Sequence, residues 1–148
     1  MEALKLDLSE EEELYTIDDI YALPDGKRAE LIDGRIYDMA PPGWTHQRTL
    51  NYLNNEIYNY IKGNDGKCHV LPAPFAVFLN KDKVTYVEPD VSVICEEEKL
   101  DEKGCHGAPD WVIEIVSLSS RRMDYYIKLF KYRDAGVREY WIVDPAKQ

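Results

Sequence analysis

Apolar and polar positions follow three different patterns along the chain, and each pattern predicts a different element. Residues 44–62 carry apolar side chains at helical spacing, which predicts an amphipathic helix with one face packed on a sheet. Residues 87–95 and 111–117 have β-branched side chains on both faces, as in strands buried between two layers. A shorter apolar run at 139–143 predicts a further strand.

Turn and capping residues divide the rest of the chain into short elements. Thr16 and Asp19 have capping-box spacing for a short helix that ends before Pro24. Two strand-like runs within 28–39 flank Asp33-Gly34, which predicts a β-hairpin. Residues 69–79 predict a strand whose prolines place its start at an edge or a bulge.

The second half of the chain adds a loop and a helix. Residues 96–108 are polar and irregular, which predicts a mobile surface loop. Ser119 or Ser120 can cap a helix that runs to about Ala135, and Gly136 can end it in the left-handed conformation. The order of elements indicates an α/β domain with helices on a mixed sheet. We expect one domain over 15–148, after an acidic, flexible lead-in over 1–14.

Two acids interrupt the apolar strands. Asp90 follows Pro89 at the start of one run, and Glu114 lies alone inside the other. A carboxylate that leaves water without a compensating cation or donors costs several kcal/mol, roughly. Two such acids on neighbouring strands therefore predict a shared cation.

Composition narrows the class of protein. The 148 residues are 45% hydrophobic, enough for one core, and no apolar run is long enough to span a bilayer. The start lacks the features of a signal peptide, so we expect a cytoplasmic protein without a membrane partner. The three cysteines are odd in number and lack paired metal spacing, which predicts neither a disulfide framework nor a zinc site.

The net charge of −10 counts against broad, nonspecific attraction to nucleic acid, because such affinity depends on Lys and Arg neutralising phosphates. The charge is uneven, however, since residues 121–133 are rich in Lys and Arg. A local basic surface is therefore possible there.

Pro89-Asp90 and the tripeptide Glu114-Ile115-Val116 resemble the signature of the PD-(D/E)XK nucleases, although valine replaces the signature lysine. The chain resembles the Uma family of restriction endonucleases, in which this lysine has moved to the following helix. In that family the segment usually reads Ser-Pro-Ser, whereas this chain has Leu118 at the position of the proline. Further strands usually follow the position of Gln148 in the family, so the chain could be truncated. The matching phrases are Glu30-Leu31-Ile32-Asp33-Gly34, Met39-Ala40-Pro41-Pro42, His46-Gln47, Pro89-Asp90-Val91-Ser92-Val93, Gly107-Ala108-Pro109-Asp110, Val112-Ile113-Glu114-Ile115-Val116-Ser117 and Ala135-Gly136-Val137-Arg138-Glu139-Tyr140-Trp141-Ile142-Val143-Asp144-Pro145.

The resemblance implies a restriction-endonuclease-like fold and an endonuclease that hydrolyses DNA, which we expect to act as a homodimer. Asp90, Glu114 and the Ile115 carbonyl would bind Mg²⁺ or Mn²⁺, since these ions prefer oxygen ligands. Lys128, in the helix after Glu114, would orient or deprotonate the attacking water. Glu30 matches an accessory acid that holds a metal-bound water or a second ion.

Each candidate also has a structural interpretation. Asp90 could cap a turn or pair with an arginine, and Glu114 could belong to a buried ion pair. Lys128 could pair with Asp124 on a solvated helix face, Glu30 could be an exposed hairpin residue, and His46 could cap the next helix. Tyrosines and Trp141 are expected in the core or at interfaces rather than stacked on bases. A noncatalytic binding or assembly module with the same fold is the main alternative, and a two-carboxylate glycoside hydrolase ranks last.

Overall fold

The computed structural model describes residues 14–118 and 120–147, so most of the expected lead-in and the possible cap at Ser119 lie outside the described residues. The elements are α1 (Ile17–Tyr21), β1 (Ala29–Ile32), β2 (Arg35–Asp38), α2 (Trp44–Gly63), β3 (His69–Pro72), β4 (Val77–Phe78), β5 (Val91–Ile94), η1 (Glu97–Lys99), β6 (Leu100–Asp101), β7 (Gly104–His106), β8 (Trp111–Ile115), the π-helical η2 (Met123–Ile127), α3 (Lys128–Ala135) and β9 (Glu139–Val143).

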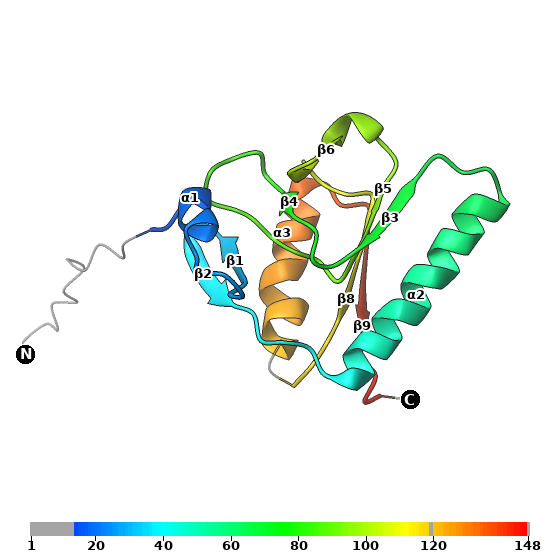
Figure 1. The fold of residues 1–148 in the computed structure, drawn as a ribbon, viewed down its shortest axis with the longest axis horizontal. Coiled ribbons are helices and arrows are strands. Elements are labelled where there is room, and N and C mark those ends of the chain that lie inside the picture. The colour runs from blue at the N-terminus through cyan, green and yellow to red at the C-terminus, as the bar shows by residue number, and fades with distance from the viewer. Residues whose placement is uncertain (1–13, 119, 148) are drawn as a thin grey trace, which may run out of the picture.

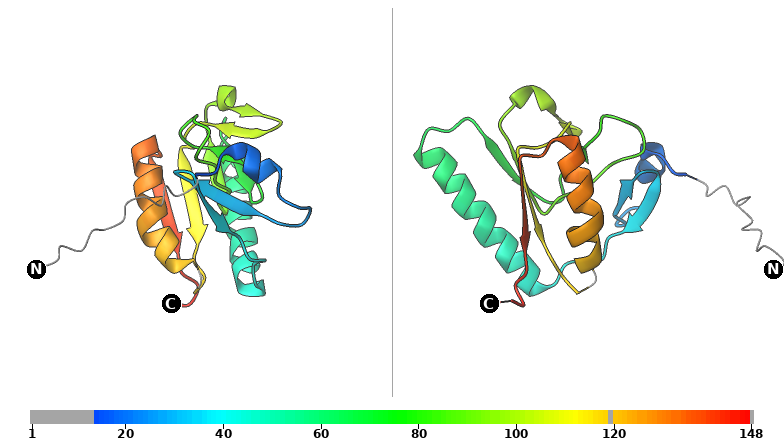
Figure 2. Two further views of the ribbon diagram at one scale, coloured as in Figure 1. Left: turned by 90° about the vertical axis from the view of Figure 1, so that its left-hand side faces the viewer. Right: turned by 180° about the vertical axis from the view of Figure 1, so that it is seen from behind.

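A four-stranded sheet in the order β3-β5-β8-β9 forms the centre of the fold (Figure 1). β5 runs antiparallel to β3 and β8, whereas β9 runs parallel to β8. The helices α2 and α3 lie on opposite faces of this sheet (Figure 2). The mixed α/β architecture predicted from the sequence is confirmed.

Alternate residues of β8 point to the two helical layers. Ile113 and Ile115 pack with Leu50 of α2, whereas Val112 packs with Tyr132 of α3. Because side chains of a strand alternate between faces, Glu114 shares the α3 side with Val112. β5 is buried along its whole length, and β8 is buried except at Trp111, as expected for strands between two layers.

Capping and turn residues along the chain give the expected elements. The Asp19 carboxylate accepts the Thr16 N–H at 2.8 Å at the start of α1. β1 and β2 pair around Asp33 and Gly34, which adopt φ values of 50° and 78°. Gly136 ends α3 with a φ of 97°, where a side chain would be strained.

Three expectations from the sequence are wrong. Residues 96–108 do not form an irregular loop, because β6 and β7 form a hairpin that pairs with β4 and buries Cys105. The strand expected over 69–79 is two strands, β3 and β4, which belong to different sheets. Trp141 is 43% exposed rather than in the core, since β9 is the edge strand; its ring meets Trp111 edge-on and its Nε1–H donates to Glu139.

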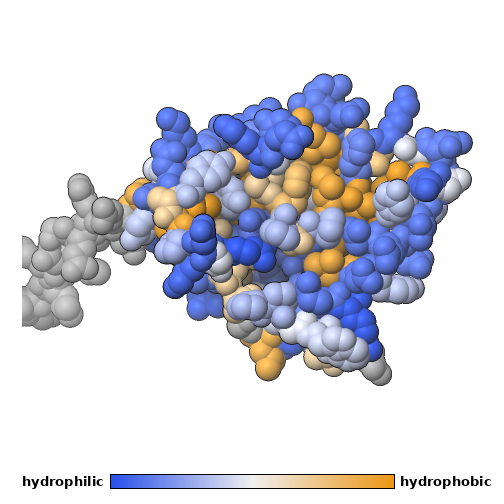
Figure 3. All heavy atoms as spheres, viewed as in Figure 1, coloured by the Kyte–Doolittle hydropathy of each residue, from blue (hydrophilic) through white to orange (hydrophobic). Residues whose placement is uncertain are grey.

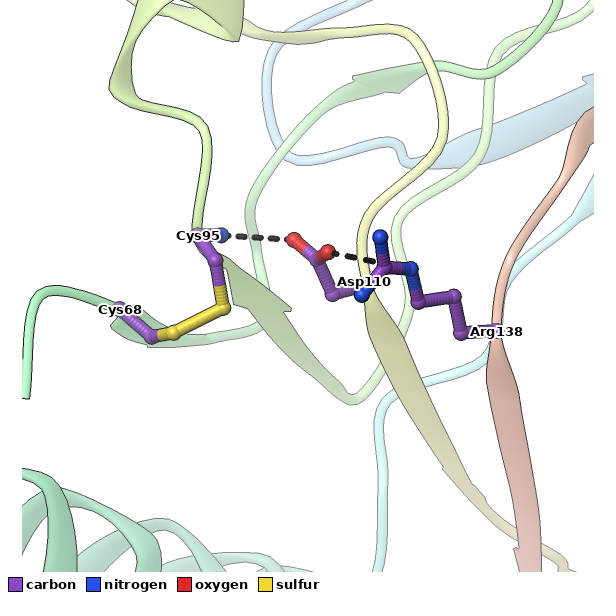
Figure 4. Close-up of a disulfide and its surroundings, with 4 residues drawn as sticks. All are labelled: Cys68, Cys95, Asp110 and Arg138. Atoms are coloured by element: carbon purple, nitrogen blue, oxygen red, sulfur yellow. Dashed lines mark hydrogen bonds and ion pairs between the residues drawn. A yellow bond between two sulfur atoms is a disulfide. The ribbon is translucent and has the colours of Figure 1, made fainter.

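The cysteine prediction is also wrong, because Cys68 and Cys95 form a disulfide (Figure 4). Cys68 comes just before β3 and Cys95 just after β5, and the register pairs His69 with Ile94. Strand pairing therefore brings together two cysteines that are 27 residues apart in the chain. Cys105 keeps a free thiol, and burial raises its pKa to about 11.

On the face drawn in Figure 3, hydrophilic residues form most of the outline, and apolar residues are exposed near the middle. Within residues 14–118 and 120–147, no helix has both the length and the apolar character that crossing a membrane requires.

Candidate active site

Asp90 and Glu114 meet at one end of the β5–β8 pair. Asp90 immediately precedes β5, and Glu114 lies near the end of the antiparallel β8. The Ile115 N–H donates to the Asp90 Oδ2 at 2.7 Å, which fixes that carboxylate against β8. The two strands therefore place both predicted acids beside the Ile115 backbone.

Lys128 occupies the middle of a buried acidic cluster. Its Nζ lies 2.7 Å from the Glu30 Oε1 and 3.3 Å from the Glu114 Oε1. The Asp124 Oδ1 lies 3.9 Å from the same nitrogen. The Lys128 side chain is 5% exposed, so the alternative of a solvated helix surface is wrong. The π-helical η2 leads directly into α3 at Lys128, and such turns are frequent at functional sites.

Glu30 belongs to the same cluster and is not an exposed hairpin residue. It is buried in β1, and its Oε2 accepts the Glu88 N–H at 2.8 Å. Its other oxygen accepts from Lys128. The structure thus brings together the four residues predicted as catalytic, Glu30, Asp90, Glu114 and Lys128.

Other residues complete the cluster, and we had not predicted them as functional. The Tyr132 hydroxyl donates to the Glu114 Oε1 at 2.8 Å, and the Tyr140 hydroxyl donates to the Asp124 carbonyl at 2.8 Å. The His46 Nε2 lies 3.2 Å from the Asp90 Oδ2, and the N-cap of α2 is Gly43, so the capping role considered for His46 is wrong. Tyr132 follows Lys128 by one helical turn, and this spacing was the one signal in the sequence that could have identified it.

Burial and the mutual charges of the cluster shift the pKa values of its members. It raises the pKa of Glu114 well above its usual range, and the neighbouring carboxylates add to this rise against the opposing charge of Lys128. Burial likewise raises the pKa of Asp124 to about 6. Burial alone would lower the pKa of Lys128, but the surrounding carboxylates, Glu114 first, raise it well above its usual range. The hydrogen bond to Asp90 raises the pKa of His46.

The donor set and its charge fit a divalent cation. Four carboxylates, those of Glu30, Asp90, Glu114 and Asp124, face one lysine and one histidine, so negative charge remains in excess even when His46 is protonated. The carboxylates supply the oxygen ligands that Mg²⁺ and Mn²⁺ prefer. Among the residues that the structure describes, no three His, Cys, Asp or Glu side chains are arranged to hold a metal ion. A site here would therefore need a non-side-chain ligand such as the Ile115 carbonyl.

The basic segment predicted over 121–133 is largely neutralised. Lys128 points into the acidic cluster, Arg121 pairs with Asp144, and Lys131 pairs with Asp33. These pairings leave less free positive charge on this segment than its composition suggests.

Two of three comparisons with known proteins find a match for the chain. A family model described as "Uma2: Putative restriction endonuclease" matches residues 12–148. A solved structure described as a "putative nuclease belonging to DUF820" from Anabaena variabilis ATCC 29413 superposes with a TM-score of 0.70 at 21% sequence identity, covering 89% of this chain and 75% of that one. No curated protein matches the chain.

Proposed function

We propose that this protein, which belongs to the Uma2 family, is an endonuclease that uses Mg²⁺ or Mn²⁺ to hydrolyse phosphodiester bonds of DNA. Family membership and the nuclease-like fold support a nuclease. The observation that carries the proposal is the burial of three carboxylates, those of Glu30, Glu114 and Asp124, around the single Lys128 ammonium group. The fourth carboxylate, that of Asp90, is held beside them by the Ile115 N–H. DNA as the substrate follows from the description of the family.

Asp90, Glu114 and the Ile115 carbonyl would hold the ion. Bound there, a divalent ion would polarise the scissile phosphate and lower the pKa of a water. Tyr132 and Lys128 both donate to the Glu114 Oε1, which fixes the orientation of that ligand. The Ile115 N–H and His46 restrain Asp90 in the same way. Substitution of such outer partners commonly lowers metal affinity or activity by about 10- to 100-fold.

Lys128 would act as a cation rather than as a base. Its pKa is raised, so the amine holds its proton at neutral pH. A charged amine can orient the attacking water through a hydrogen bond and stabilise negative charge on the phosphate. Glu30, at 2.7 Å, would hold the Lys128 ammonium group in position for this role.

A cleavage assay with matched variants tests the proposal. Wild-type protein is incubated with supercoiled plasmid and with single-stranded circular DNA in Mg²⁺, Mn²⁺ or EDTA. We expect nicking only with a divalent ion, and loss of nicking in Glu114→Gln. Glu139→Gln changes an exposed glutamate on the neighbouring β9 and serves as the control. Metal binding by a wild-type protein that cleaves neither DNA would leave the site but reopen the question of its substrate, whereas a wild-type protein that neither binds the metal nor cleaves would favour the noncatalytic module.

A further inference from the structure

A hollow of about 370 Å³ opens beside the carboxylate cluster. Its walls come from three places, namely the first turn of α2, the chain after β8 and the chain after β9, which lie close together at the lower edge of Figure 1. The volume falls in the range of roughly 300–1,000 Å³ that is typical of ligand sites. His46 lines the hollow and also contacts Asp90, so one side chain borders both the hollow and the candidate centre.

The lining combines apolar surface with a flat aromatic ring. Val116, Leu118 and Pro145 contribute apolar walls, and Trp44 adds an indole that is 74% exposed. The Arg48 guanidinium lies 4.6 Å from the centre of the Trp44 ring, in a cation–π contact that orients the indole. A large aromatic ring exposed at the edge of a hollow is suited to stacking on a planar ligand.

Positive charge accompanies this ring. Arg121 lines the hollow, and its Nη2 is held by the Asp144 Oδ2 at 2.8 Å while 41% of its side chain stays exposed. Arg48 thus brings positive charge to the Trp44 ring in a chain whose net charge is −10, whereas the charge of Arg121 is offset by Asp144, which also lines the hollow. Because so acidic a protein gains little affinity from phosphate neutralisation alone, stacking has to supply a larger share of nucleic-acid binding.

We propose that this hollow, referred to below as the Trp44 hollow, binds an unpaired nucleobase of the substrate strand, so that the scissile phosphate beside that base reaches Asp90 and Glu114. The inference rests on the proposed function. A base inside a duplex stacks on both faces and offers none to Trp44, whereas an unpaired or extruded base can stack on an aromatic ring. The preferred substrate is therefore a single strand, or a duplex with a locally unpaired site.

Equilibrium binding without cleavage tests the inference separately from the nuclease activity. Fluorescence anisotropy of a labelled single-stranded oligonucleotide, and of its perfect duplex, is measured in EDTA. We expect the wild type to bind the single strand more tightly than the duplex. Trp44→Ala should weaken single-strand binding by about 5- to 150-fold, and Trp44→Phe should restore part of it.

Tyr58→Ala is the matched control. Tyr58 is 52% exposed on the same helix and also has a cation one turn later, Lys62, but it does not line the hollow. We expect this variant to bind like the wild type. Equal affinity of Trp44→Ala and wild type, equal losses in both variants, or no binding of the single strand would overturn the inference. Metal-dependent cleavage that is unchanged in Trp44→Ala would support the nuclease activity and contradict base binding in the Trp44 hollow. Binding that depends on Trp44, in a protein that does not cleave, would support base binding and contradict the nuclease activity.

Discussion

Two aspartates at opposite ends of the β5–β8 pair make the same local structure in different surroundings. Each follows a proline and precedes its strand, Asp90 before β5 and Asp110 before β8. Each accepts a backbone N–H from the other strand at 2.7 Å, from Ile115 in one case and Cys95 in the other. Their side chains are similarly buried, with exposures of 13% and 17%.

The neighbours of the two aspartates differ. Beyond Asp90 lie the half-buried His46 and the buried Glu114, with Lys128 behind them. The ionic partner of Asp110 is Arg138, at 4.0 Å and 82% exposed, next to the Cys68–Cys95 disulfide (Figure 4). A Pro-Asp pair at a strand start therefore stabilises strand pairing in both places. The excess of buried negative charge marks only the Asp90 end as a candidate metal centre.

The largest expected difference is in cleavage. Asp90→Asn should lower the rate by about a thousandfold, or about 4 kcal/mol, because a metal ligand is lost while the side-chain oxygen can still accept the Ile115 N–H. Asp110→Asn should cleave within about twofold of wild type. Rates are measured on supercoiled plasmid at saturating Mg²⁺. Equal losses in the two variants would show that both aspartates act only through the fold.

The second contrast concerns how much the basic residue at each end of the β5–β8 pair contributes to the free energy of unfolding. Lys128→Met should lower the free energy of unfolding by about 3 to 5 kcal/mol, because buried carboxylates lose their partner. Arg138→Met should cost less than about 1 kcal/mol, since this arginine is exposed. Urea unfolding followed by circular dichroism measures both. Similar small losses would mean that the buried ion pairs contribute no net stability.

The third contrast concerns the disulfide. Replacing both Cys68 and Cys95 by serine opens a 27-residue loop and should lower the free energy of unfolding by about 3 kcal/mol. The cleavage rate below the unfolding temperature should stay within about twofold of wild type, because the disulfide lies at the Asp110 end of β5. A large loss of cleavage in a protein that remains folded would contradict this separation of the two ends.

The smallest effect is a pH dependence. Burial raises the pKa of Asp124 to about 6, so between about pH 4 and 6 the folded state holds a proton that the unfolded chain releases. Stability should therefore fall by about 1 to 3 kcal/mol as the pH rises through this window. Asp124→Asn should flatten the slope, and Asp134→Asn controls for removing a carboxyl from the same helical segment. An identical slope in wild type and Asp124→Asn would refute the assignment.

Periodicity in the sequence sufficed for the main elements. α2, the hairpin around Asp33 and the strand of Glu114 could be predicted because apolar spacing and turn residues within each segment indicate its structure. The β6–β7 hairpin and the disulfide could not be predicted in this way. Both depend on pairing between distant segments, and the polar residues of 96–108 gave no sign that β4 would pair with β7.

The candidate site was predictable only in part. Two lone acids in apolar strands suggested a cation from their chemistry, whereas resemblance to a family was needed to single out Lys128 and Glu30. Asp124, Tyr132 and Tyr140 were not predicted as part of the site, because tyrosines and acids are common in sequence. Only packing shows that Tyr132 donates to Glu114, that Asp124 lies beside Lys128 and that Tyr140 donates to the Asp124 carbonyl. The Pro-Asp pattern alone does not separate Asp90 from Asp110, and it was the resemblance to the family that singled out Asp90.

Calorimetric titration of Mn²⁺ and Mg²⁺ into wild type, Asp90→Asn and Asp110→Asn tests the central claim most directly. The account predicts saturable binding by the wild type and by Asp110→Asn, and its loss in Asp90→Asn. Circular dichroism of the three proteins controls for folding. Binding that persists in Asp90→Asn, or that is missing from the wild type, would contradict a metal centre at the Asp90 end of the sheet.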